Sequence, residues 1–227
     1  MTSATAPTAH DVNEGLDLGT LNLMLEALGD FVSAELPESR MLDLDHEDRC
    51  PEDTVRAMCS DALGVHLVFI PEEYGGLGGG AFDSYRVCER MARVDIGLGT
   101  SVFATFLGSD PILMGGTDDQ RKEWLGRIAE QGTIFAYAAT EPEAGSDLAA
   151  MSTTAVPVDG SSGEGTDGYR INGRKQWISN GSIADACTVL AMAPGGPSWF
   201  IVERGTPGFS SAPPSATSCR ASAWTCT

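Results

Sequence analysis

The strongest constraint on the fold is a change in hydrophobic period near Gly132. Before this glycine, apolar residues recur every three or four positions, which is the period of one buried helix face. After it, short runs alternate apolar and polar residues, a pattern typical of half-buried strands. The sequence therefore predicts an α+β protein, in which an all-α N-terminal helical domain is followed by a small antiparallel β-barrel domain.

The first half carries local signals for the start and end of helices. We expect helices from Leu18 to Val32, from Pro51 to Gly64, after Gly80, from Ile96 to Leu107 and after Thr117. Thr117 and Gln120 form a capping box for the last of these, and Gly132 is placed to end it. Residues 17–132 are thus predicted to form one helical domain, and residues 1–16 a flexible tail.

The second half has several short strand candidates bounded by turn residues. They cover 133–140, 151–158, 168–172, 174–179, 186–193 and 199–203. Asn172-Gly173 lies between two of them and is a strong signal for a tight hairpin. We expect residues 133–209 to form the β domain. Residues 210–227 contain one charge and no periodicity, and we expect no regular structure there.

Composition narrows the classes of function. The 227 residues include 32 acidic and 14 basic side chains, for a net charge of −18, which argues against general binding to nucleic acid or anionic membranes. No apolar run approaches the roughly 18 residues of a membrane span, and the N-terminus lacks the features of a secretory signal. Six cysteines without a C-x-x-C and three scattered histidines predict thiols in a reducing cytoplasm and no metal site.

One segment suited to ligand chemistry runs from Tyr137 to Asp147. A strand enters a turn in which Gly145, Ser146 and Asp147 can expose successive backbone N–H groups, an arrangement that holds an anion or the acceptor edge of a ring. An ordinary β-turn is the alternative interpretation. The carboxylates of Glu141, Glu143 and Asp147 are expected to be solvated on this turn.

A second segment runs from Asn172 to Gly181. On a regular strand, Trp177 and Ser179 lie two residues apart and point to the same face. Together they offer an aromatic plane and a hydroxyl to a ligand. Taken alone, a core tryptophan beside a surface serine explains the pattern as well.

Three motifs that follow one another along the chain indicate a protein family more specifically than either segment alone. Pro-Glu-Glu-Tyr-Gly-Gly-Leu-Gly begins at Pro71, Thr-Glu-Pro-x-Ala-Gly-Ser-Asp begins at Thr140, and Asn-Gly-x-Lys-x-Trp-Ile-Ser-Asn begins at Asn172. Over roughly residues 17–209, this chain resembles the acyl-CoA dehydrogenase family of flavoenzymes.

The resemblance implies FAD as cofactor. The matching positions are Tyr137, Ala139, Thr140, Gly145, Ser146, Trp177, Ile178 and Ser179. Thr140 is implied to bond the pyrimidine side of the flavin, Trp177 to cover its edge and Ser179 to bond N5. Ser146 is implied to lie near the acyl-CoA as well.

The resemblance also implies an activity. Family members dehydrogenate an acyl-CoA thioester between Cα and Cβ and pass electrons to an electron-transfer flavoprotein. In most branches the catalytic base is a Glu in a third, helical domain that also builds the homo-oligomer. We expect that domain to be missing here, as from a truncated or frame-shifted product, so that this chain is inactive and its oligomeric state open.

Two alternatives stay open. The chain could be a non-catalytic fragment that keeps residual flavin or acyl-CoA binding. It could also be a relative of the acyl-CoA oxidases or nitroalkane oxidases, which share the flavin loop.

Overall fold

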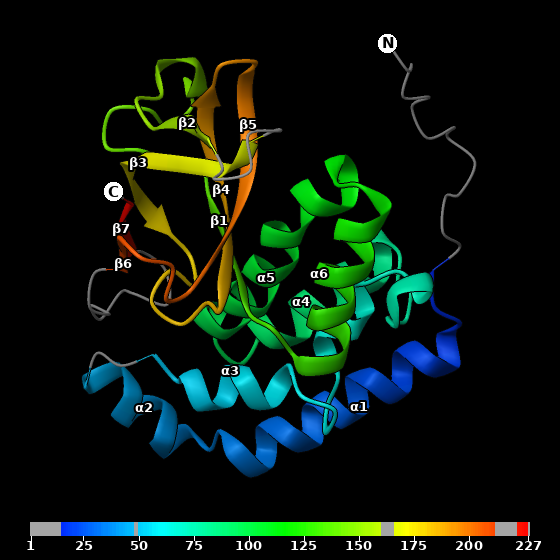
Figure 1. Cartoon of the computed structure of the whole chain (residues 1–227). Helices are drawn as coiled ribbons and strands as arrows, with labels where there is room; N and C mark the ends of the chain where they lie inside the picture. Colours follow the sequence, from blue (N-terminus) through cyan, green and yellow to red (C-terminus); the bar gives the residue numbers. More distant parts are fainter. Residues whose placement is uncertain (1–14, 48–49, 160–165, 212–221, 227) are drawn as a thin grey trace.

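A computed structural model describes residues 15–47, 50–159, 166–211 and 222–226, in which a helical half precedes a β half (Figure 1). The helices are α1 (Leu18–Glu35), α2 (Glu38–His46), α3 (Glu52–Met58), α4 (Ala81–Ala92), α5 (Ile96–Gly115) and α6 (Asp118–Gln131), with short 3-10 helices η1 (Val65–Phe69), η2 (Glu72–Tyr74) and η3 (Leu148–Ala150). The strands are β1 (Phe135–Ala138), β2 (Thr154–Asp159), β3 (Thr166–Ile178), β4 (Ala186–Ala193), β5 (Gly196–Glu203), β6 (Phe209–Ser211) and β7 (Ser222–Cys226). The α+β prediction is confirmed.

Local capping fixes the ends of the helices. The Asp17 carboxylate accepts hydrogen bonds from the first-turn amides of α1. Thr117 and Gln120 form the predicted capping box at the start of α6. At the other end of α6, Gly132 has a φ of +63°, and a Cβ there would overlap the Cys59 carbonyl. Only glycine adopts this positive φ without strain and has no Cβ to overlap that carbonyl.

Three helical predictions need correction. Helix α2 was not predicted, because its apolar residues do not form a clear stripe. Helix α3 ends at Met58 rather than near Gly64, and turns fill the interval. Helix α5 continues past Pro111 to Gly115, and within the described part of the chain it is the one helix long and apolar enough to span a membrane; 56% of the apolar stretch is buried in the protein, as in a core helix.

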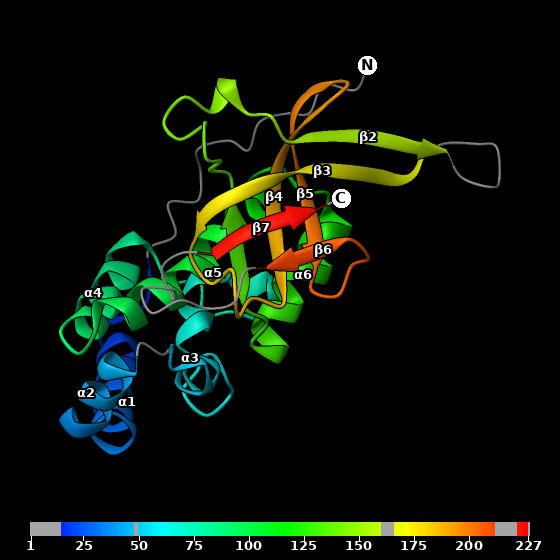
Figure 2. The same cartoon turned by 90° about the vertical axis from the view of Figure 1, so that its left-hand side faces the viewer.

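The sheet is not closed into a barrel and is not purely antiparallel, so both of those predictions are wrong. Its strand order is β1-β4-β2-β3-β7-β6, with β5 paired to β4. β1 and β4 pair in parallel. Between them in the chain lies an arm formed by the antiparallel strands β2 and β3. Figure 2 shows that arm projecting from the rest of the sheet.

The predicted hairpin at Asn172-Gly173 does not form, because β3 runs straight through it. Thr154 of β2 faces Asn172, and Gly173 faces Cys226 of β7. A Cβ at residue 173 would overlap the side chain of Thr153. The glycine is therefore required for a close approach of two segments rather than for a turn.

The last stretch of the chain also differs from expectation. β6 and β7 pair with each other, and β7 pairs with β3, so the prediction of no regular structure is wrong at 210–211 and 222–226. Residues 212–221 and 227, and residues 1–14 of the predicted tail at 1–16, lie outside the described residues. Within the described end of that tail, the Leu16 amide donates to the Asp83 carboxylate at 2.8 Å. Cys50 is disulfide-bonded, which contradicts the prediction that the cysteines are thiols. Cys59, Cys88 and Cys187 are free, as predicted.

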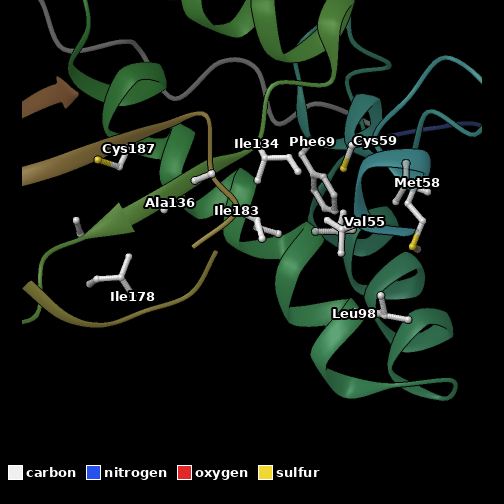
Figure 3. Close-up of a cluster of buried hydrophobic side chains, with 14 of the residues drawn as sticks. Val55, Met58, Cys59, Phe69, Leu98, Ile134, Ala136, Ile178, Ile183 and Cys187 are labelled. Atoms are coloured by element: carbon white, nitrogen blue, oxygen red, sulfur yellow. The ribbon is translucent and has the colours of Figure 1, made fainter. Parts of the chain in front are cut away.

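One hydrophobic core joins the two halves. Buried side chains of the helical half, including Val55, Met58 and Leu98, share a cluster with Ile134 and Ile178 of the β half (Figure 3). Burying a large apolar side chain contributes about 1.5 to 3 kcal/mol, so this shared cluster holds the halves together.

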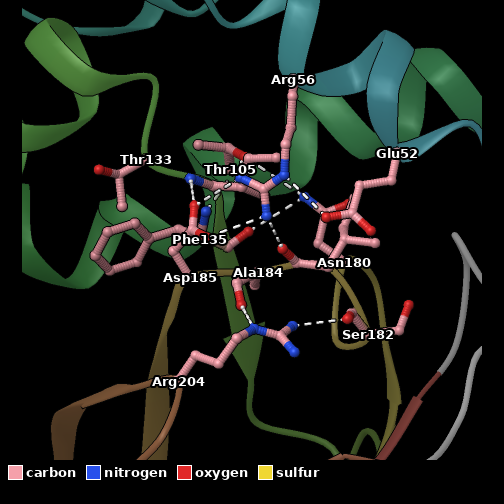
Figure 4. Close-up of polar contacts among 12 residues, drawn as sticks. Glu52, Arg56, Thr105, Thr133, Phe135, Asn180, Ser182, Ala184, Asp185 and Arg204 are labelled. Atoms are coloured by element: carbon pink, nitrogen blue, oxygen red, sulfur yellow. Dashed lines mark hydrogen bonds and ion pairs between the residues drawn. The ribbon is translucent and has the colours of Figure 1, made fainter.

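A polar clamp lies beside this core. The Arg56 guanidinium in α3 donates to both carboxylate oxygens of Asp185 at 3.1 Å, and Asp185 also accepts the Ile134 amide at 2.9 Å (Figure 4). The bidentate geometry fixes the orientation of α3 against the start of β4.

Candidate functional site

The two predicted ligand-binding segments lie side by side at the end of β1 and the end of β3. The Gln176 amide donates to the Thr140 carbonyl at 2.9 Å, and the Lys175 ammonium donates to the Ala139 carbonyl at 2.9 Å. Residues 36 positions apart in sequence are thus joined, once through two backbones and once through the Lys175 side chain. This junction places the turn after β1 next to the loop after β3.

Trp177 has an unusual backbone conformation on that surface. Its φ is +62°, a value that non-glycine residues adopt rarely, and 66% of its side chain is exposed. The pairing of β3 with β7 shifts register between Lys175 and Ile178, and such bulges redirect side chains. The simple alternation that placed Trp177 and Ser179 on one face therefore does not hold, because β3 ends at Ile178 and the backbone at Trp177 is left-handed.

Asn180 anchors the loop that follows β3 and carries Ser179. Its φ is +62°, its side chain is fully buried, and its Nδ2 donates to the Ser101 carbonyl at 2.7 Å and the Phe135 carbonyl at 3.2 Å. Figure 4 shows this side chain between α5 and β1. The loop is therefore held by contacts to both halves of the molecule.

The turn after β1 presents a row of backbone donors. Glu141 and Ala144 close the turn through two backbone hydrogen bonds, of 2.8 and 3.3 Å. Beyond it, the amides of Gly145, Ser146 and Asp147 donate to no acceptor within the described parts of the chain. Successive unpaired N–H groups of this kind form an anion-binding concavity.

Glu141 differs from the expectation of a solvated acid. Only 3% of the residue is exposed, and its carboxylate accepts from the Lys175 ammonium at 2.9 Å, the Ser152 amide at 2.7 Å and the Thr153 amide at 2.9 Å. Burial raises the pKa of the Glu141 carboxyl, but hydrogen bonds from Ser152, Thr153 and Lys175 outweigh burial and hold that pKa well below its usual range. Glu143 and Asp147 are exposed, as expected.

Lys175 was not among the predicted site residues. Lys175 lies four residues after the buried Ile171 on β3. Because side chains alternate along a strand, the sequence could have predicted that Lys175 also points inward. A lysine at an inward position predicts a buried acidic partner.

The other predicted positions divide into surface and core. Gly145 and Ser146 are exposed, and Ser179 is half-buried. The Tyr137 ring is half-buried and lies 4.7 Å from the ring of Trp199. Ala139 and Ile178 have buried side chains, so these two residues can offer a ligand only their backbone.

An apolar cavity of about 740 Å³ lies between α4 and α5 in the helical half. Its lining includes Phe69, Tyr85, Cys88, Ile96, Phe103 and Phe106. The rings of Phe69 and Phe106 stack at 5.2 Å and fix one wall. Sequence analysis did not identify this cavity, because its walls come from residues assigned only to helix cores.

Comparison with known proteins places these features in a family. Residues 20–132 match the acyl-CoA dehydrogenase N-terminal domain and residues 136–227 match the acyl-CoA dehydrogenase middle domain. Cyclohex-1-ene-1-carbonyl-CoA dehydrogenase of Geobacter metallireducens is 36% identical over 192 residues, which are 82% of this chain and 48% of that protein. The chain thus spans about half the length of the curated relatives it matches.

Solved structures agree with the sequence matches. A chain from the electron transferring flavoprotein of Acidaminococcus fermentans superposes with a TM-score of 0.80 at 29% identity, covering 95% of this chain and 56% of that one. An acyl-CoA dehydrogenase complexed with FAD from Bacillus anthracis gives a TM-score of 0.77 at 28% identity, covering 96% and 37%. With both domain families matched in order and the fold shared, this chain belongs to the acyl-CoA dehydrogenase family.

Proposed function

We propose that the surface between β1 and β3 binds the isoalloxazine and pyrophosphate of FAD. The observation that carries this proposal is a concentration of unsatisfied donors on one surface. The Thr140 amide and the amides of Gly145, Ser146 and Asp147 have no acceptor in the described part of the molecule. The exposed, left-handed Trp177 lies across the same junction, and backbone strain of this kind concentrates at ligand sites.

The donors and aromatic groups fit the parts of this cofactor. The turn amides at 145–147 suit the pyrophosphate, the Thr140 amide and hydroxyl suit the pyrimidine side of the ring, and Trp177 and Ser179 suit its edge near N5. When bound, FAD supplies a hydride acceptor. The protein's part is to hold the ring and to place donors where negative charge develops on reduction.

We further propose that the acyl portion of an acyl-CoA thioester enters the cavity between α4 and α5, with Ser146 near the thioester. The lining of that cavity is almost entirely apolar and aromatic, which suits a hydrocarbon chain. α5 lines the cavity and also packs against β1, so substrate and flavin would meet along this helix.

The reaction we propose is α,β-dehydrogenation of the thioester, with electrons passing to an electron-transfer flavoprotein. Removal of the α-proton requires a carboxylate of suitable pKa within reach of Cα. Glu141 is unsuited, because its oxygens are occupied by Ser152, Thr153 and Lys175 and its pKa is lowered. Glu143 and Asp147 lie on the turn that would hold the cofactor, so we propose that none of the three is the base and that this chain alone does not turn over acyl-CoA.

Replacement of Trp177 tests the proposed flavin site. Trp177→Ala should weaken FAD binding about three- to tenfold, because an aromatic contact of this kind contributes about 0.5 to 1.5 kcal/mol. The matched control is Tyr169→Ala, which removes a half-exposed aromatic side chain elsewhere on β3. Equilibrium dialysis with FAD measures both affinities. Equal losses for the two variants, or no loss for Trp177→Ala, would contradict the assignment.

A further inference from the structure

Lys175 is a buried cation with two specific acceptors. Its side chain is 3% exposed, and its ammonium donates to the Glu141 carboxylate and to the Ala139 carbonyl, each at 2.9 Å. The carboxylate is itself held by the amides of Ser152 and Thr153. The ammonium therefore sits in a fixed frame, and its bond to Ala139 orients one peptide unit.

That peptide unit ends in the Thr140 amide. A trans peptide is planar, and its C=O and N–H groups point to opposite sides. With the Ala139 carbonyl turned inward to Lys175, the Thr140 N–H must point outward, away from the buried ion pair. The next carbonyl, of Thr140, is held by the Gln176 amide at 2.9 Å, so the peptide planes on both sides of Thr140 are fixed.

We infer that Lys175 is a positioning residue, which acts through the Ala139 carbonyl to aim the Thr140 N–H at an acceptor on the flavin ring. The inference rests on the flavin site proposed above and adds a residue that does not itself touch the cofactor. The Thr140 amide has no acceptor among the described residues, so the orientation imposed by Lys175 leaves this donor unused within the protein.

The ion pair suits this task better than a neutral contact. An ammonium has three donors and can hold a carbonyl and a carboxylate at once, whereas a methionine of similar length would hold neither. Glu141 offsets the charge of the buried ammonium, so the ammonium is not left without an anionic partner. The pair therefore fixes backbone geometry at the ring without adding net charge beside it.

Amide correlation spectra of the 15N-labelled chain, recorded during titration with FAD, test the inference. In the wild type, the amides of Thr140, Gly145 and Ser146 should shift as FAD binds. In Lys175→Met, the Thr140 shift should be lost and the Kd should rise about tenfold, or about 1.4 kcal/mol, because one aligned donor is lost. The amides at 145 and 146 should still shift at saturation, which a general structural defect would not allow.

Three further variants keep the test decisive. Lys175→Arg retains a donor and should restore the Thr140 shift. Arg127→Met removes a surface ion pair with Glu203 and should leave the titration unchanged. If Lys175→Met does not fold, the double variant Glu141→Gln, Lys175→Met removes both charges and should show the same selective loss.

The outcomes separate the inference from the proposed function. A Thr140 shift of wild-type size in a folded Lys175 variant lacking the donor would overturn the inference and leave the flavin site standing. Absence of FAD-dependent shifts at all three amides in the wild type would overturn the proposed site, and the inference with it.

Discussion

The helix caps of the helical half and the candidate site of the β half differ in where their polar groups find partners. At the helix caps the partners are close in sequence: Asp17 caps amides two and three residues away, and Thr117 pairs with Gln120. At the candidate site they are distant: Lys175 bonds residues 34 and 36 positions away. Local partners fix individual helices, whereas distant partners fix how separate segments meet.

The same comparison explains why the candidate site lies in the β half. Segments joined at a distance can leave donors unpaired at their junction, as the Thr140 amide is within the described residues. At a helix start that is capped by a neighbouring side chain, first-turn backbone N–H groups already have an acceptor. The proposed flavin-binding surface is thus a product of long-range contacts.

The largest effect should follow from breaking the buried ion pair at the candidate site. Glu141→Leu leaves the buried Lys175 ammonium without its partner and two amides without an acceptor, and should reduce the free energy of unfolding by about 3 to 5 kcal/mol. Urea denaturation measures this loss. Its control is Arg127→Met at the surface, for which about 0 to 1 kcal/mol is expected. Similar losses in both variants would show that the buried pair has no special role.

A smaller effect is expected from breaking a local contact. Gly132→Ala forces a Cβ into the left-handed conformation that ends α6 and against the Cys59 carbonyl, and should cost about 2 to 3 kcal/mol. The control is Gly126→Ala, which lies within α6 with open space around its Cβ and should be neutral or stabilising. Thermal unfolding compares the two, and equal melting temperatures would contradict the capping role.

These contrasts show how much of the fold the sequence could predict. The starts of α1 and α6 and the end of α6 were predictable, because each is set by residues within one helical turn of the boundary. The strand at 186–193 was predictable too, from a run of apolar residues between polar ones. Strand direction and sheet closure were not, because they depend on which distant segments pair.

Two residues of the site illustrate the same limit. Gly173 looked like a turn residue, since the sequence does not show that Thr153 approaches its backbone. Glu141 looked solvated, since its partners Ser152 and Lys175 lie 11 and 34 residues away. The motifs located the candidate surface, and only the structure showed how its two segments are joined.

The smallest of the expected stability effects concerns pH and lies in the helical half. His66 is buried, and burial lowers the pKa of its imidazole, although the Ala129 carbonyl opposes this shift. The unfolded chain therefore takes up a proton first, so stability should be complete above about pH 6.5 and should fall as the pH drops below that value. His66→Gln should flatten this slope. The midpoint of urea denaturation, measured at several pH values between 7.5 and 5, gives this slope. Parallel slopes for wild type and His66→Gln would show that His66 is not the source of the pH dependence.

The most direct test of the flavin-binding surface is hydrogen–deuterium exchange of the chain with and without saturating FAD. The unpaired amides at 140 and 145–147 should exchange rapidly alone and should be protected by FAD, together with the loop at 177–179. The helices that line the apolar cavity should change less. Protection confined to α4 and α5, or none at the junction of β1 and β3, would contradict the account.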